Sequence, residues 1–132
     1  MFKIKCFLLF LFFINLSYAQ VTQDEVKAKI EIKNMEGNTI LTGTAENSSD
    51  ILKSASYKLT VIKKNSKSNN QTNNAQEGMF TLNAGEFKKL SSTQINIEDG
   101  DEVIVMLVFF DESKQIISKD RVVLGEQKKK LI

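Results

Sequence analysis

The side chains that most often do chemistry in enzymes are scarce in this chain. It has no histidine, and its single cysteine is Cys6. Ser92 or Thr93 could attack a substrate only beside a general base, and histidine is the usual base. Two pairs of closely spaced carboxylates remain, Asp99/Asp101 and Asp111/Glu112. Both pairs lie in segments typical of tight turns, where acidic side chains accept backbone N–H bonds and stay in water. A buried acid–base pair is the alternative, but we expect no enzyme and no catalytic residue.

A metal site would need oxygen ligands, because histidine is absent and Cys6 lies in a segment that the mature protein is expected to lose. Residues 98–102 (EDGDE) are the most acidic run. They lack the length and ligand spacing of a calcium-binding EF-hand loop. We interpret this Asp-Gly segment as a short hairpin turn, with a weak surface calcium site as the alternative. We expect no metal and no cofactor.

Residues 1–19 have the three parts of a secretory signal peptide. The segment has a basic start with Lys3 and Lys5, continues as an unbroken apolar run over 7–14, and ends with Ser17-Tyr18-Ala19, a small-x-small cleavage site. The apolar run is shorter than the roughly 20 residues that a membrane-spanning helix needs. We therefore expect a cleaved signal, a mature chain that begins at Gln20, and no membrane association after cleavage.

The charge of the chain changes with this cleavage. The full sequence has 18 basic and 16 acidic residues, a net charge of +2. Lys3 and Lys5 lie in the predicted signal peptide, so the predicted mature chain is neutral. A neutral chain lacks the positive charge that neutralises phosphates, and we expect no nucleic-acid partner. Loss of Cys6 leaves no disulfide.

From Val26 onward, apolar and polar residues alternate in short runs separated by turn residues, as in half-buried β-strands. We expect seven strands, at about residues 26–33, 39–46, 55–63, 72–82, 87–97, 102–110 and 115–124. No convincing helix interrupts them. This pattern predicts an all-β fold, a seven-stranded antiparallel immunoglobulin-like β-sandwich over residues 20–125. A short basic tail follows at 126–132.

The sixth expected strand is apolar on both of its faces. One face, expected to line the core, comprises Val103, Val105, Leu107 and Phe109. The other face comprises Ile104, Met106, Val108 and Phe110. Acidic residues at both ends of the run act as protection against aggregation. The second face has two interpretations: it is covered by long neighbouring side chains, or it is an apolar patch for a client or for self-association.

Lysines form a second candidate surface on the first and third expected strands. They are solvated side chains that protect strand edges, or a basic patch that captures a charged, unfolded partner in fast, salt-sensitive encounters. The combined candidate client-binding residues are Lys27, Lys29, Lys58, Lys63, Lys64, Ile104, Met106, Val108 and Phe110.

Three short motifs resemble the CsgH-like family of curli-assembly chaperones: residues 76–86 (QEGMFTLNAGE), 90–96 (LSSTQIN) and 119–123 (KDRVV). The resemblance extends over about Val26 to Leu124. It implies a periplasmic immunoglobulin-like protein of a curli-producing Gram-negative cell. It further implies a chaperone that binds the major curli subunit, an unfolded or nucleating amyloid protein, and inhibits its premature polymerisation without ATP. We expect it to act as a monomer.

One feature of the related enterobacterial chaperone, a Cys-x-Cys pair on a strand, is missing, so no redox role is implied. Two other functions remain open from the residues alone. The chain could be a secreted immunoglobulin-like inhibitor of a protease or other enzyme, with loop 63–70 plugging the active site. It could also be a structural adhesion module within a larger assembly.

Overall fold

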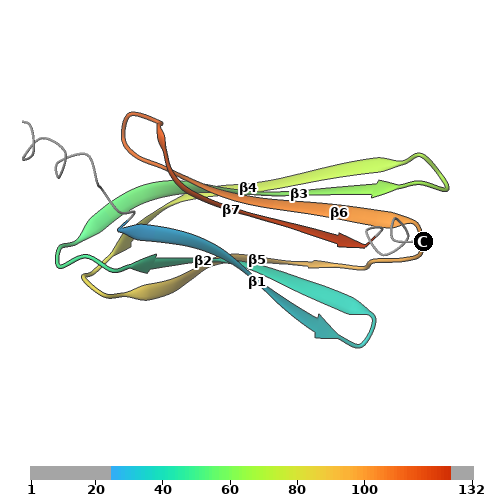
Figure 1. Ribbon diagram of the computed structural model, residues 1–132, viewed down its shortest axis with the longest axis horizontal. Coiled ribbons are helices and arrows are strands. Elements are labelled where there is room, and N and C mark those ends of the chain that lie inside the picture. The colour runs from blue at the N-terminus through green and yellow to red at the C-terminus, as the bar shows by residue number, and fades with distance from the viewer. Residues whose placement is uncertain (1–24, 126–132) are drawn as a thin grey trace, which may run out of the picture.

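The structure is a computed structural model that describes residues 25–125. The predicted signal peptide, 1–19, and basic tail, 126–132, lie outside the described residues. Seven strands form the described part (Figure 1): β1 (Val26–Met35), β2 (Asn38–Asn47), β3 (Lys53–Asn65), β4 (Gln71–Leu82), β5 (Phe87–Ile95), β6 (Asp101–Phe110) and β7 (Ile116–Gly125). The predicted all-β fold with seven antiparallel strands is confirmed.

The strands form two sheets that pack face to face. One sheet has three strands in the order β1-β2-β5, and the other has four in the order β4-β3-β6-β7. Every neighbouring pair is antiparallel. Figure 1 shows the two sheets as stacked layers, with β4 as an edge strand of the four-stranded sheet. The predicted sandwich is therefore the observed architecture.

The Asp-Gly segment before β6 corrects one detail of the prediction. It was expected to close a hairpin, but β5 pairs with β2 and β6 pairs with β3, so the segment carries the chain from one sheet to the other. The local turn chemistry is as expected, because Gly100 has a φ of 86° and the Asp101 N–H donates to the Glu98 carbonyl at 3.0 Å. A turn sequence allows the chain to reverse, whereas the choice of strand partner depends on which apolar faces are buried together.

The core lies between the sheets, and the inner face of β6 is its centre. The four residues on that face have no exposed surface: Val103, Val105, Leu107 and Phe109. Leu107 packs on the backbone of β2, where a Cβ built on Gly43 would lie 3.1 Å from Leu107 Cδ1. The rings of Phe109 and Phe80 have centroids 4.8 Å apart. β6 pairs with β3 on one side and with β7 on the other, so it is an inner strand of its sheet.

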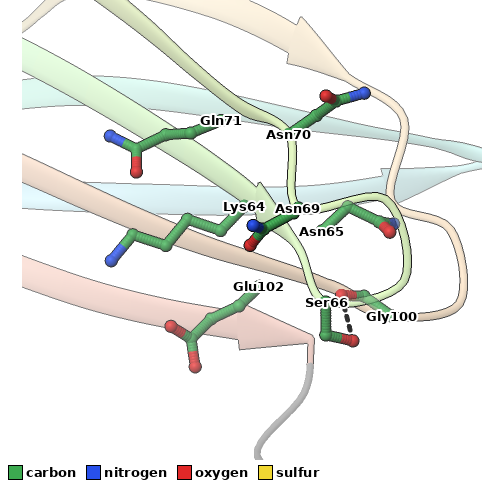
Figure 2. Close-up of a pocket in the computed structure, with 8 residues that line it drawn as sticks. All are labelled: Lys64, Asn65, Ser66, Asn69, Asn70, Gln71, Gly100 and Glu102. Carbon is green, nitrogen blue, oxygen red and sulfur yellow. Dashed lines mark hydrogen bonds between the residues drawn. The ribbon is translucent and has the colours of Figure 1, made fainter.

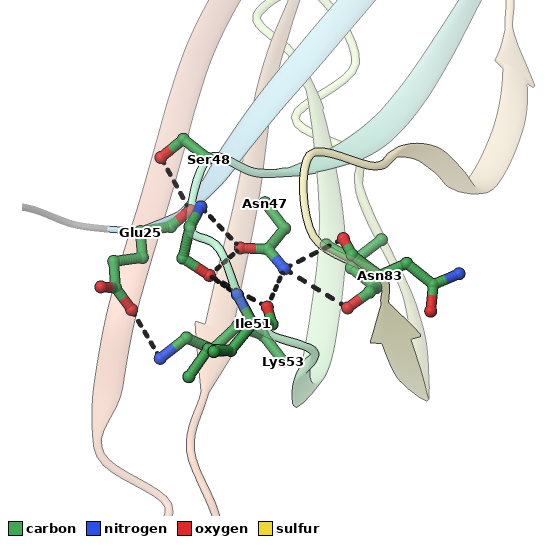
Figure 3. Close-up of polar contacts among 8 residues, drawn as sticks. Glu25, Asn47, Ser48, Ile51, Lys53 and Asn83 are labelled. Carbon is green, nitrogen blue, oxygen red and sulfur yellow. Dashed lines mark hydrogen bonds and ion pairs between the residues drawn. The ribbon is translucent and has the colours of Figure 1, made fainter.

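A buried asparagine fixes the passage from the first sheet to the second. Asn47, at the end of β2, has no exposed surface. Its Nδ2 donates to the carbonyls of Ile51 at 2.8 Å, Asn83 at 3.0 Å and Leu82 at 3.3 Å. Its Oδ1 accepts from the N–H and the hydroxyl of Ser49 at 3.0 and 2.7 Å. Figure 3 shows how this one amide joins the end of β2, the 48–52 connection and the end of β4.

The two sheets also contact each other through their edges. Two backbone N–H groups of β1, those of Ala28 and Ile30, point away from β2 and towards β7. They donate to Ser118 Oγ at 2.9 Å and to Asp120 Oδ2 at 2.8 Å. Side chains of one sheet thus satisfy the edge of the other, which removes a free template for strand addition.

Truncation of the central core residue tests this packing. Leu107→Ala should lower the free energy of unfolding by about 2–5 kcal/mol, because it removes buried methyl groups and leaves a cavity against Gly43. Denaturant melts measure this difference. Val108→Ala, one residue further on the outer face, should cost clearly less. Equal costs for the two variants would contradict the assignment of the two faces.

The Asn47 network gives a second stability prediction. Asn47→Ala should cost about 3 kcal/mol in a denaturant melt, because it removes the donor from three backbone carbonyls, and an unsatisfied buried group such as the Leu82 carbonyl costs about 1–3 kcal/mol. Asn47→Asp should also destabilise the protein, since a carboxylate cannot donate to those carbonyls. Asn73→Ala on the exposed side of β4 is the matched control, and it should change stability by no more than about 0.5 kcal/mol. A neutral Asn47→Ala variant would show that the network is not structural.

Candidate functional site: the outer face of the four-stranded sheet

The second face of β6 forms a continuous apolar row on the outside of the four-stranded sheet. We call it the β6 row, and its members are Ile104, Met106, Val108 and Phe110. Each is half-buried, whereas the alternate residues of β6 are fully buried in the core. Because directly paired residues of antiparallel strands share a face, the register identifies the neighbours of this row on β3 and β7.

Long basic side chains flank the middle of the β6 row. Val108 lies between Lys58 of β3 and Lys119 of β7, and Met106 has Arg121 beside it on β7. All three basic residues are exposed. Their stems can cover apolar surface while the charged ends stay in water. We call Lys58, Lys119 and Arg121, together with the β6 row, the basic–apolar face.

The apolar character of this face widens at both ends of β6. Ile104 pairs with Ile62 of β3 and Val123 of β7, and Phe110 pairs with Ile116, which is 59% exposed. An apolar row of this length with exposed apolar residues at its margin exceeds the single apolar side chains that are normal on a surface. The surroundings therefore partly support both interpretations of β6: basic stems cover the row, and apolar surface is still exposed.

The positive charge of the face is only partly neutralised. Lys58 Nζ lies 3.8 Å from Glu77 Oε1, and the two side chains are 47% and 69% exposed, so this ion pair contributes little to stability. Within residues 25–125, Lys119 and Arg121 have no carboxylate within ion-pair distance. The face can therefore attract an acidic segment of a partner.

Lys64 lies at the far end of the same face, beside a polar hollow of about 320 Å³ (Figure 2). Glu102 is its direct partner on β6. The other lining residues come from the end of β3, the β3–β4 connection, the first residue of β4 and the turn before β6: Asn65, Ser66, Asn69, Asn70, Gln71 and Gly100. The hollow holds one lysine, one glutamate, amides and a hydroxyl, and the Ser66 hydroxyl is bonded to the Gly100 carbonyl at 3.3 Å. This set provides no activated nucleophile.

Lys27 and Lys29 lie on the opposite side of the molecule. They are exposed on the outer face of the three-stranded sheet, where Lys27 pairs with Glu46 and Lys29 with Thr44. The structure thus separates these two lysines from Lys58, Lys64 and the β6 row. One client-binding surface cannot include both groups unless the client wraps around the sandwich.

Lys63 has a structural environment that the sequence did not reveal. Its Nζ lies 3.3 Å from Asp101 Oδ2 and donates to the Asn96 carbonyl at 2.6 Å. The Asp101 side chain is 3% exposed and also accepts from Asn65 Nδ2 at 2.7 Å and from the Glu98 N–H at 2.8 Å. Lys63 therefore joins β3 to the crossover segment before β6 instead of extending into solvent.

The pKa of Asp101 follows from these contacts. Burial alone would raise it, but the hydrogen bonds from Asn65, Glu98 and Lys63 together with the Lys63 charge outweigh burial and hold it below the ordinary value. Asp101 is thus a charged structural residue in the neutral pH range. Asp101 belongs to the acidic run 98–102, for which a weak surface calcium site was the alternative to a turn. Within residues 25–125, no group of three or more acidic, histidine or cysteine side chains could hold a metal ion.

Lys119 and Arg121 lie on the basic–apolar face, although they were not among the candidate residues predicted from the sequence. They belong to the 119–123 motif, but their position beside Val108 and Met106 depends on the β6–β7 register. A two-residue period on β7 could have placed them on the outer face, whereas the register shift near Phe110 could not be read from the sequence.

Solved structures with the same fold include two small bacterial proteins. CsgH of R. palustris aligns with a TM-score of 0.54 and 20% identity, over 71% of this chain and 89% of its own. The curli protein CsgC of E. coli aligns with a TM-score of 0.59 and 12% identity, over 73% of this chain and 96% of its own. The resemblance to the CsgH-like family is thus confirmed at the level of structure.

A third match has a different character. β-Glucuronidase of Bacteroides uniformis aligns with a TM-score of 0.50 and 11% identity over 76% of this chain, but over only 14% of the enzyme. The likeness therefore concerns one small part of a large protein.

A scan of protein-family models and a search of curated proteins give no match. Among the described residues there is no helix with the length and hydropathy to cross a membrane.

The Asp101 environment predicts a pH dependence of stability. A carboxylate with a lowered folded pKa stabilises the fold above its unfolded pKa of about 3.9, and this contribution is lost as the pH falls through the folded value. The free energy of unfolding should therefore fall as the pH drops below about 4. Asp101→Asn should be less stable at pH 7 and should show a shallower fall. A variant with the slope of the native chain would contradict the assigned contacts.

Proposed function

We propose that this protein is a periplasmic chaperone that delays amyloid formation by a curli subunit, and that it holds the subunit on the basic–apolar face. The fold shared with CsgH and CsgC supports this class of protein, since the alignments cover 89% of CsgH and 96% of CsgC, and 71% and 73% of this chain. The observation that carries the choice of face is the β6 row, which stays half-buried next to three basic side chains. We further propose that the protein acts by binding alone and catalyses no reaction.

The face suits a partner that is unfolded and amyloid-forming. Basic side chains at its margin speed the encounter with acidic segments, and the attraction is weakened by salt. Apolar groups between the basic stems then contact apolar side chains of the client over a short patch. Such contacts are weak and reversible, so a chaperone of this kind binds nuclei or monomers and releases them.

The same sandwich can carry this apolar face without polymerising. The β6 backbone is bonded on both sides, so the apolar row presents side chains and no free strand edge. A cross-β fibre grows by adding strands to an edge. The face can therefore contact a client without adding to its fibre.

Fibrillation kinetics of the purified curli major subunit test the proposal. The mature chain, present at a small fraction of the subunit concentration, should lengthen the lag phase. Lys58→Glu/Lys119→Glu/Arg121→Glu should shorten that delay by half or more, because the charge at the margin of the β6 row is reversed. Raising the salt concentration from about 0.1 M to 1 M shortens the Debye length from about 10 to 3 Å and should also weaken the delay.

The matched control reverses three lysines on the other sheet, Lys27→Glu/Lys29→Glu/Lys33→Glu. It changes the net charge by the same amount and should keep most of the activity. If the control loses the delay and the first variant keeps it, the client binds the three-stranded sheet. If both lose it equally, net charge alone governs the encounter. A native chain without any delay at equal stoichiometry contradicts the chaperone function.

Two further functions have less support. A protease inhibitor would need a protruding loop, but the predicted loop 63–70 is shorter than expected, because β3 extends to Asn65 and β4 begins at Gln71. The Asn65 N–H also donates to the Asn70 carbonyl at 2.9 Å, which closes the turn. An adhesion module is consistent with the fold, but no feature of the surface favours it over the chaperone.

A further inference from the structure

The sandwich has four strand edges, and three of them are protected. The N–H groups of Ala28 and Ile30 on β1 are bonded to side chains of β7. The edge of β7 packs against β1 and carries three charged residues at 119–121. The edge strand β5 carries Lys88 and Lys89 and has a register shift near Gly43 of β2. Charges, bulges and covering side chains are the usual means of preventing strand addition.

Among residues 25–125, nothing protects the edge of β4 in this way along most of its length. It is 12 residues long, and its pairing with β3 has no register shift. Glu77 is its one charged residue, and Glu77 faces Lys58. Lys88 Nζ donates to the Thr81 carbonyl at 3.0 Å, which occupies only the last part of the edge.

The register shows which backbone groups are free. The Asn65 N–H donates to the Asn70 carbonyl, so Asn65 and Asn70 form a hydrogen-bonded pair, and such pairs alternate along an antiparallel ladder. Even-numbered residues of β4 therefore bond to β3, and odd-numbered residues direct their N–H and C=O groups outward. The bond from Lys88 to Thr81 agrees with this alternation. In the middle of β4, the outward groups of Asn73, Ala75, Glu77 and Met79 have no hydrogen-bond partner among the residues that the structure describes.

The side chains along this edge suit an uncharged strand. Residues 71–76 read Gln-Thr-Asn-Asn-Ala-Gln, and all but Gln76 are exposed. Amide side chains on adjacent strands form hydrogen-bonded ladders in cross-β structure. A hollow of about 390 Å³ lies at the other end, between the edges of β4 and β5, with a lining that includes Tyr57, Gly78, Met79, Phe80, Lys88 and Leu90. It can receive an apolar side chain of an added strand.

Gly78 keeps this hollow open. A Cβ on Gly78 would lie 2.9 Å from Tyr57 Cε1, so a larger residue would displace the ring. Met79, beside it, is 87% exposed. The edge thus combines free backbone groups, amide side chains and an apolar recess, which together recognise an extended polypeptide.

We propose that the free edge of β4 binds an extended, uncharged strand of the client, rich in Asn, Gln, Ser or Thr, by β-strand addition. This inference rests on the proposed function, because it identifies the client as an amyloid-forming chain. The odd-numbered side chains of β4 share the outer face with Lys58, so an added strand extends the sheet next to the basic–apolar face.

Amide hydrogen exchange of the mature chain gives a residue-by-residue test. The first probe is a blocked, uncharged peptide of Asn, Gln, Ser and Thr, and the second is the monomeric curli major subunit. Either probe should slow exchange several-fold at Asn73, Ala75, Glu77 and Met79. Asn74 and Gln76, already bonded to β3, should change little. The inference is overturned if neither probe slows exchange on β4, if the slowed amides lie elsewhere, or if odd- and even-numbered amides of β4 slow equally.

A proline variant tests the same edge in the fibrillation assay. Ala75→Pro removes one outward N–H and leaves the bonds from β4 to β3 in place. It should lose most of the delay, whereas Ala75→Thr, which keeps the N–H, should retain it. Both variants must first give native-like melting curves, and if Ala75→Pro does not fold, Ala75→Lys takes its place as an edge-blocking charge.

The outcomes separate this inference from the proposed function. If the native chain delays fibrillation and Ala75→Pro delays it equally, strand addition is wrong and the chaperone function stands. If the native chain gives no delay but the peptide protects the four amides, the edge binds strands and the chaperone function fails. Protection that rises with protein concentration alone, together with a dimer in sedimentation, assigns the edge to a second copy and overturns the proposal.

Discussion

The burial of one face of β6 is the constraint on which the rest of the structure depends. Its four inner residues are completely buried, and Leu107 packs on Gly43 of the other sheet, so β6 must lie inside its sheet with a strand on each side. An apolar side chain of this size contributes about 1.5–3 kcal/mol when fully buried. This position of β6 fixes β3 and β7 as its neighbours, and it leaves β4 as an edge strand. The surface features that matter for function follow from that order.

The two surfaces that we propose for client binding have the same structural origin. Because β6 is apolar on both faces, burial of one face leaves the other on the outside of the sheet, partly covered by Lys58, Lys119 and Arg121. Because β3 pairs with β6, only the far side of β3 is available to β4, and nothing lies beyond β4 in the described part of the chain. A sandwich that protects three edges and leaves one amide-rich edge free is suited to contacts with single strands.

Most of the fold could be predicted from the sequence, because period-two alternation and turn residues are local signals. The inner residues of β6 lie in the core as expected. Sheet order could not be predicted, since it depends on contacts between segments far apart in the chain. The Asp-Gly turn before β6 illustrates the difference, because its local geometry is that of a turn while its strands belong to different sheets.

The candidate site was predictable only in part. The outer face of β6 was evident from its composition, and Lys58 and Lys64 do lie beside it. Lys63 instead forms an ion pair with the buried Asp101, and Lys27 and Lys29 lie on the other sheet. These positions could not be predicted, because alternation gives the face of a residue within a strand but not the sheet to which the strand belongs. Ser118, Asp120 and Asn47 gave no signal, since their roles arise from contacts across the sandwich.

Methyl NMR of the mature chain mixed with monomeric curli subunit shows which face of the sandwich the client binds. The signals of Ile104, Met106 and Val108 on the outer face of β6 should shift or broaden as subunit is added. The signal of Ile40, on the outer face of the three-stranded sheet, should stay unchanged. Changes at Ile40 without changes on β6 would show that the client does not bind the basic–apolar face.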